Sequence, residues 1–187
     1  MSAETDPVPI SEPPSGAIDI RFATPQDAGA IHRFVSELAA FEREPEAVEA
    51  TPETLRRQLS SPEPPFECLI AEIGGEPVGF ALFFPNYSTW RGRQGIYLED
   101  LYITPAHRRK GVARALLRRL AEIAVERNAG RMELAVLNWN RSAVEFYRSL
   151  GAKPLDEWTT YRMTDVELRR IVEGPTPPSP GPSPPPR

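Results

Sequence analysis

Metal-binding and redox residues are scarce in this sequence of 187 residues, which has one cysteine, Cys68, and two histidines, His32 and His107. A single cysteine excludes an intramolecular disulfide framework. Histidines with no further histidine or cysteine at ligand spacing predict no metal site. Cys68 lies in an apolar run, so we expect a small buried hydrophobe, and nothing supports an acyl-cysteine intermediate.

Long apolar runs and an excess of basic charge are also missing. No apolar stretch approaches the about 20 residues that cross a membrane, and the acidic, Pro-rich start does not resemble a signal peptide. The formal net charge of −4 disfavours a broad basic surface for nucleic acid. These absences predict a cytoplasmic protein without membrane or nucleic-acid partners.

Proline, by contrast, is abundant, with 22 residues, and many of them lie near the two ends. Residues 1–16 lack a hydrophobic period, and residues 174–187 are almost entirely Pro, Ser and Gly. Neither segment buries enough apolar surface to offset its ordering entropy. We expect two disordered tails around one domain of residues 17–173, the second tail being solvated or a polyproline ligand for another protein.

Between the tails, strand and helix periods alternate. Strands are expected at residues 18–22, 66–73, 78–84, 96–103 and 131–137, with a closing strand pair at 152–163. Helices are expected after Thr24-Pro25, after Thr51-Pro52, after Gly111, from Asn140 to Gly151 and at 165–172. This order predicts an α/β fold with a mixed sheet and a parallel strand–helix–strand unit at 96–137.

A basic segment, Arg108-Arg109-Lys110, precedes Gly111 where the helix after the fourth strand begins. The first N–H groups of a helix lack internal partners and attract anions, and glycine lets a phosphate approach the backbone closely. Neither the Walker pattern nor the Rossmann glycine spacing is present. Taken alone, the segment is either a phosphate site or a solvated basic helix start.

In context, this segment resembles the pyrophosphate loop of the GNAT superfamily of N-acetyltransferases: Arg or Gln, two residues, Gly, one residue, then Gly or Ala. Arg108, Gly111 and Ala113 match that pattern, and the segment from Asn140 to Tyr147 resembles the second cofactor element. The resemblance implies a GNAT fold with a mostly antiparallel sheet and acetyl-CoA as co-substrate. It implies cofactor contacts from Leu101, Tyr102, Ile103, Arg108, Arg109, Lys110, Gly111, Val112, Ala113, Arg114, Asn140 and Ala143.

Within the superfamily, the sequence is most similar to the spermidine/spermine (diamine) and thialysine N-acetyltransferases. Residues 37–42, 66–72 and 97–101, together with Trp139-Asn140 and Phe146-Tyr147, carry this similarity. It implies direct acetyl transfer to a primary amine of a small diamine or polyamine, in a homodimer. Another acceptor (an amino acid, an aminoglycoside or a protein N-terminus) or a non-catalytic acyl-CoA-binding module remains an alternative.

The same resemblance implies two catalytic roles. Tyr147 is the expected general acid for the departing thiolate, although a packed aromatic is the alternative. An alkylammonium has a pKa near 10, so its deprotonation at neutral pH costs roughly 4 kcal/mol, and we assign that proton to Glu99. Regular pleating sends Glu99 and Asp100 to opposite faces, but the family is known for a bulge in this strand. Asp100 is expected to bind the cation or to be a buried structural carboxylate.

Three further residues are expected to line the acceptor groove. Phe41 and Glu42 match a Tyr-Glu pair of the resembling family, with one hydroxyl lost. Trp90 matches an aromatic of the substrate loop, where it could attract an ammonium group. Ser88 stands where the polyamine enzymes tend to carry an acid, a departure that weakens the case for a long polycation.

Overall fold

The computed structural model describes residues 16–174, so the expectations for the two tails fall almost wholly outside the described residues. The chain divides into two compact units, residues 1–137 and residues 138–187. Each unit is described by itself.

The first unit is built on a five-stranded sheet in the order β1-β2-β3-β4-β5. The strands are β1 (Ile18–Phe22), β2 (Glu67–Ile73), β3 (Glu76–Ser88), β4 (Arg93–Ile103) and β5 (Met132–Leu134). The first four pair antiparallel, and β4 pairs parallel with β5. The predicted α/β class, the mixed sheet and the parallel crossover are confirmed.

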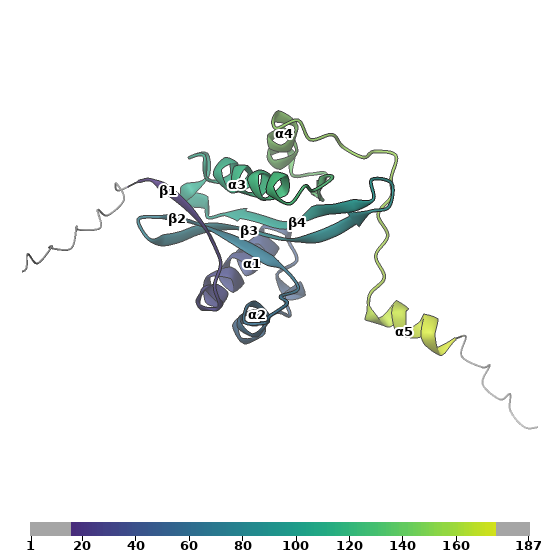
Figure 1. Ribbon diagram of the computed structural model, residues 1–187. Helices are drawn as coiled ribbons and strands as arrows, with labels where there is room; N and C mark the ends of the chain where they lie inside the picture. The colour runs from purple at the N-terminus through teal and green to yellow at the C-terminus, as the bar shows by residue number, and fades with distance from the viewer. Residues whose placement is uncertain (1–15, 175–187) are drawn as a thin grey trace, which may run out of the picture. The chain divides into compact units, whose positions relative to one another are not determined.

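Helices cover both faces of this sheet (Figure 1). Helices α1 (Ala28–Glu42) and α2 (Pro52–Leu59) lie on one face, and α3 (Val112–Glu126) lies on the other. The helix starts predicted at Thr51-Pro52 and Thr24-Pro25 are present. Thr51 Oγ1 accepts a hydrogen bond from Thr54 N at 3.2 Å and caps α2. Thr24-Pro25 opens a single 3-10 turn, Pro25–Asp27, which leads into α1.

Each helical layer buries its own apolar cluster against the sheet. Under α1, the rings of Phe34 and Phe80 stack with centroids 5.6 Å apart, and Tyr102 closes the cluster. Cys68 belongs to it and is 2% exposed, and burial raises the pKa of its thiol, which therefore stays protonated. Helix α3 buries Val112, Leu116, Leu117, Leu120 and Ile123, as its period predicts.

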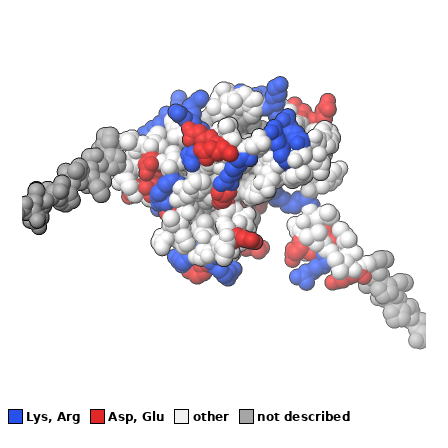
Figure 2. All heavy atoms as spheres, viewed as in Figure 1, with Lys and Arg blue, Asp and Glu red and all other residues white. Residues whose placement is uncertain are grey.

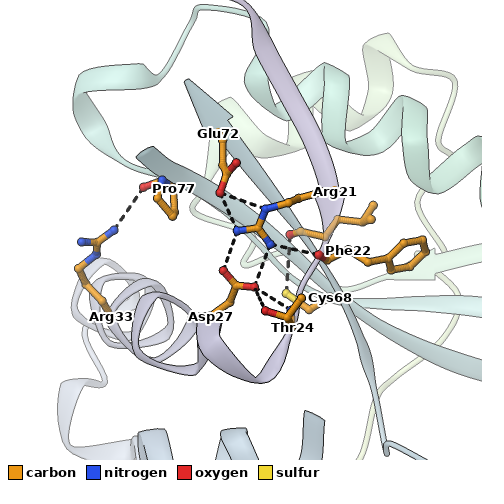
Figure 3. Close-up of polar contacts among 9 residues, drawn as sticks. Arg21, Phe22, Thr24, Asp27, Arg33, Cys68, Glu72 and Pro77 are labelled. Atoms are coloured by element: carbon orange, nitrogen blue, oxygen red, sulfur yellow. Dashed lines mark hydrogen bonds and ion pairs between the residues drawn. The ribbon is translucent and has the colours of Figure 1, made fainter. Parts of the chain in front are cut away.

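A partly buried ion-pair network ties the start of α1 to the sheet (Figure 3). The Arg21 guanidinium of β1 donates two hydrogen bonds to the Asp27 carboxylate, at 2.7 and 2.8 Å, and two more to Glu72 of β2. Asp27 also accepts from the backbone N–H and hydroxyl of Thr24. Arg21 lowers the pKa of Asp27 to about 2, because its hydrogen bonds favour the ionised form.

The second unit contains α4 (Arg141–Ser149) and α5 (Asp165–Glu173), both close to their predicted positions. The expected strand pair at residues 152–163 is wrong, because this segment has no strand. Its large apolar residues, Leu155, Trp158, Tyr161 and Met163, do not keep the period of two that a half-buried strand requires. Among residues 16–174, no helix is long and apolar enough to cross a membrane.

Candidate active site

A β-bulge in β4 shapes the acidic part of the site. Leu98 pairs with Phe83 and Asp100 pairs with Leu82, so Glu99 has no partner residue on β3. Phe83 and Leu82 are adjacent and point to opposite faces of the sheet, and their partners do the same. Leu98 therefore faces α3, whereas Asp100 faces α1 although the two are only two residues apart. The bulge expected in this strand is present, and it re-aims Asp100.

Three carboxylates interact at this position: Asp100, the neighbouring Glu99, and Glu42 at the end of α1. Burial, followed by the like charges of Glu99 and Glu42, raises the pKa of Asp100 to about 6. Burial also raises the pKa of Glu42. The three carboxylates favour the binding of a cation, and Asp100 places a carboxyl group with a near-neutral pKa beside that cation.

The backbone beyond the bulge forms a second part of the site. Pairing between β4 and β5 ends at Leu98–Leu134, and β4 continues for five residues through Ile103. The expected strand at 131–137 is accordingly shorter than predicted. Leu101, Tyr102 and Ile103, expected to offer backbone groups to the cofactor arm, lie in this stretch beyond the parallel pairing. The side chain of Tyr102 is buried in the core.

The start of α3 has the properties of a phosphate site. Gly111 caps the helix with φ at +88°, a conformation that glycine adopts without strain, and Arg109 before it has φ at +61°. A Cβ placed on Gly111 would find its nearest atom, Ile18 Cδ1, 4.0 Å away, so the space over this backbone is open. Arg109, Lys110 and Arg114 are exposed around it. Open space, unpartnered helical N–H groups and three cations fit a pyrophosphate.

Arg108 is also exposed, but it differs from its neighbours because its side chain contacts a backbone carbonyl and two aromatic rings. Its Nε donates to the Ile103 carbonyl oxygen at 3.0 Å. Its guanidinium carbon lies 5.4 Å from the ring centroid of Phe41 and 5.4 Å from that of Tyr102. The structure thus places Arg108 and Phe41, expected in the cofactor site and the acceptor groove respectively, in direct contact.

Trp90 lies at the turn of the β3–β4 hairpin, away from the acidic residues Glu99 and Asp100 of β4. Trp90 is 91% exposed at the hairpin turn, where Ser88 Oγ accepts a hydrogen bond from Arg91 N at 3.3 Å. Six residue steps along β4 separate Arg93 from Glu99, which corresponds to roughly 20 Å. Within one chain, the structure does not bring Trp90 together with Glu42, Glu99 and Asp100.

The second unit presents the remaining predicted residues on α4. Asn140 caps the helix by accepting a hydrogen bond from Ala143 N at 3.2 Å, as the sequence predicts. The rings of Phe146 and Tyr147 lie 5.5 Å apart. Burial raises the pKa of Tyr147 to about 12, so its phenol is protonated at neutral pH.

Glu37 is a candidate site residue that the sequence analysis did not single out. Its carboxylate hydrogen-bonds with the phenol of Tyr102 and raises the pKa of that phenol, after the larger effect of burial. The Oε2 atom of Glu37 is buried without a hydrogen-bond partner. Helical spacing could have indicated Glu37, because Glu37 and Phe41 are four residues apart and share a face of α1.

This architecture and these motifs define the class of the protein: the chain belongs to the acetyltransferase (GNAT) family, whose sequence profile matches residues 31–152. It is therefore an N-acetyltransferase, and GNAT acetyltransferases use acetyl-CoA as the acetyl donor. The open backbone at Gly111 and its exposed cations fit the diphosphate of that donor.

Among curated proteins, the chain is similar to the thialysine N-epsilon-acetyltransferase of Sus scrofa, at 39% identity over 82% of this chain and 96% of the relative. It is similar to the L-ornithine N5-acetyltransferase of Arabidopsis thaliana, at 30% identity over 81% of this chain and 86% of the relative. The spermidine/spermine N(1)-acetyltransferase-like protein 1 of Homo sapiens is 35% identical over 80% of this chain and 23% of that longer protein.

Solved structures share the fold at lower identity. An integron cassette protein from V. cholerae superposes with a TM-score of 0.71, at 23% identity, over 84% of this chain and 98% of that chain. An aminoglycoside N-acetyltransferase in complex with CoA superposes with a TM-score of 0.64, at 17% identity, over 82% of this chain and 99% of that chain. At these identities the likeness shows the fold alone.

Proposed function

We propose that the protein transfers the acetyl group of acetyl-CoA directly to a terminal primary amine of a small diamine or polyamine. The cluster of Glu42, Glu99 and Asp100 carries this proposal, because three interacting carboxylates attract a cationic acceptor. On the face shown in Figure 2, basic and acidic side chains are interspersed, which suits a small ligand held by a local cluster.

The proposed reaction needs one base and one acid. The acceptor enters as an ammonium group and loses a proton before its nitrogen attacks the thioester carbon. Glu99 takes this proton through water, and Asp100, whose pKa is about 6, stands beside it as a cation ligand and proton relay. In the tetrahedral adduct the attacking nitrogen still carries one excess proton, which it releases to solvent. Tyr147 gives its phenol proton to the departing thiolate sulfur as the carbon–sulfur bond breaks, and solvent returns a proton to Tyr147.

The binding roles follow the same division. Leu101, Tyr102 and Ile103 offer backbone groups to the donor, and Gly111, Val112 and Ala113 offer helical N–H groups to its diphosphate. Asn140 and Ala143 on α4 complete the donor site in this proposal. Phe41 and Glu42 line the acceptor groove. Trp90 is proposed to contact an acceptor from the hairpin turn. Roughly 20 Å of β4 separates Arg93, next to that turn, from Glu99 within one chain, so this role suits the expected homodimer.

A second candidate acceptor is the side-chain amine of a diamino acid such as thialysine or ornithine. Two observations favour it: the similar proteins named for these substrates, and Ser88 in place of an acid near the hairpin turn. Both candidates share a primary amine on a short chain that carries a second amine.

An acceptor screen tests the proposal. Purified full-length protein and acetyl-CoA are mixed with putrescine, spermidine, thialysine, ornithine and glycine, and liberated CoA is measured. Turnover on putrescine or spermidine above the diamino acids supports the first candidate, and the reverse order supports the second. No turnover on any diamine or diamino acid refutes both candidate acceptors. Light scattering on the same sample measures whether the protein forms the expected homodimer.

A further inference from the structure

The guanidinium of Arg108 lies where the cofactor loop meets the end of α1. Its Nε donates to the carbonyl oxygen of Ile103, the last residue of β4, at 3.0 Å. Its carbon lies 5.4 Å from each of two ring centroids, that of Phe41 on α1 and that of Tyr102 on β4. A planar cation held by two rings and a carbonyl is fixed in position as well as charged.

The two rings are anchored differently. Tyr102 is 5% exposed, and its ring lies 6.1 Å from the ring of Phe34 in the core, so it cannot move freely. Phe41 is 40% exposed and lies in the last turn of α1, which ends at Glu42. Arg108 therefore connects a buried residue of the sheet to a partly exposed residue in the last turn of α1.

The end of α1 matters because Glu42 interacts with Asp100 of the acidic cluster. We propose that Arg108 is a positioning residue for the acceptor: it holds Phe41, and with it Glu42, at the distance from Asp100 that acceptor binding requires. The inference rests on the proposed function of that cluster. It assigns to Arg108 a role beyond its expected contact with the donor's diphosphate.

The substitution Arg108→Lys separates the proposed positioning of the acceptor from the expected contact with the donor's diphosphate. Arg108→Lys keeps the positive charge that a diphosphate needs, but it removes the planar group that packs on the rings and the Nε donor. We expect the KM of the acceptor to rise about fivefold, equivalent to ~1 kcal/mol of lost cation–π contact. The KM of acetyl-CoA is expected to change by less than about twofold. Arg109→Gln, the contrasting variant, is expected to raise the KM of acetyl-CoA and leave the KM of the acceptor unchanged.

A double-mutant cycle shows whether Arg108 acts through Phe41. In the chain that carries Phe41→Leu, the further change Arg108→Lys is expected to have almost no additional effect on the acceptor kcat/KM. Phe41→Tyr keeps the ring, so in the chain that carries it the further change Arg108→Lys is expected to retain its full effect on the acceptor kcat/KM. Thermal unfolding of each variant monitors folding, and Phe41→Leu alone still tests the contact if Arg108→Lys does not fold.

Two results would overturn the inference. One is an effect of Arg108→Lys on acetyl-CoA alone, which would make Arg108 a diphosphate ligand only. The other is full additivity of the two substitutions. Both are distinguishable from failure of the proposed function, because that failure appears in the wild-type protein as the absence of turnover on any amine.

Discussion

The raised pKa of Asp100 implies that this residue destabilises the fold at neutral pH. The carboxyl group ionises near pH 6 in the folded chain and near pH 3.8 in the unfolded chain. Its ionisation is therefore less favourable in the folded state. A difference of about two in pKa corresponds to ~3 kcal/mol. Structural relaxation and solvent reduce this figure, and we expect about 1–2 kcal/mol in practice.

The sign of the effect follows from linkage. Below pH 3.8 the carboxyl is protonated in both states and costs nothing. As the pH rises from 3.8 to about 6, only the unfolded state ionises, so the folded state loses relative stability. Above pH 6 both states are ionised and the loss stays constant. Asp100→Asn keeps the shape of the side chain and removes this loss.

The assay is chemical or thermal unfolding of wild-type protein and Asp100→Asn at several pH values between 4 and 7.5. The variant is expected to unfold at a temperature roughly 3–6 °C higher at pH 7.5, with the gain shrinking toward pH 4. Glu99→Gln, a change at the exposed neighbour, is the matched control and is expected to give a smaller gain. A variant that is less stable at pH 7.5, or whose gain does not depend on pH, would refute the reasoning.

Three further outcomes are expected. Asp27→Asn should lose about 2 kcal/mol of stability at pH 7, because the Arg21 contact lowers the pKa of Asp27 to about 2; urea unfolding should show the deficit vanishing as the pH falls from 3.8 through 2. Gly111→Ala places a side chain at a positive φ, so ~1 kcal/mol of strain and a higher KM for acetyl-CoA are expected from unfolding and kinetics. Tyr147→Phe should lower kcat by about 100-fold while calorimetry shows CoA binding unchanged, and equal kcat values would leave Tyr147 as packing.

Much of the fold could be predicted from local signals, because each depends on few residues. Thr51 caps α2, and the apolar stripe of α3 is buried as its period predicts. Gly74 and Gly75, between β2 and β3, have the positive φ values of a tight turn. The α/β class and the order of the elements followed from these signals. The strands expected at 152–163 are absent. Their apolar residues lack the period of two, and strand formation depends in addition on a partner strand.

The candidate site was predictable in its residue types but less so in its geometry. The residues around Gly111 follow from a short motif, and the structure gives them the expected open backbone. The contact between Arg108 and Phe41 joins segments far apart in the sequence, so no spacing rule reveals it. Which of Glu99 and Asp100 becomes buried depends on the register between β3 and β4, and that register is a property of the folded sheet.

The bulge at Glu99 also restricts how this enzyme can change. If Glu99 took a regular place in the ladder, plain alternation in β4 would put Asp100 on the same face as Leu98, among the aliphatic side chains under α3. Burying an unpaired carboxylate there would cost several kcal/mol, a large part of the stability of an ordinary domain. Side chains at this position can therefore be exchanged while the bulge is kept, whereas a regular ladder through Glu99 would damage the fold before it altered the chemistry.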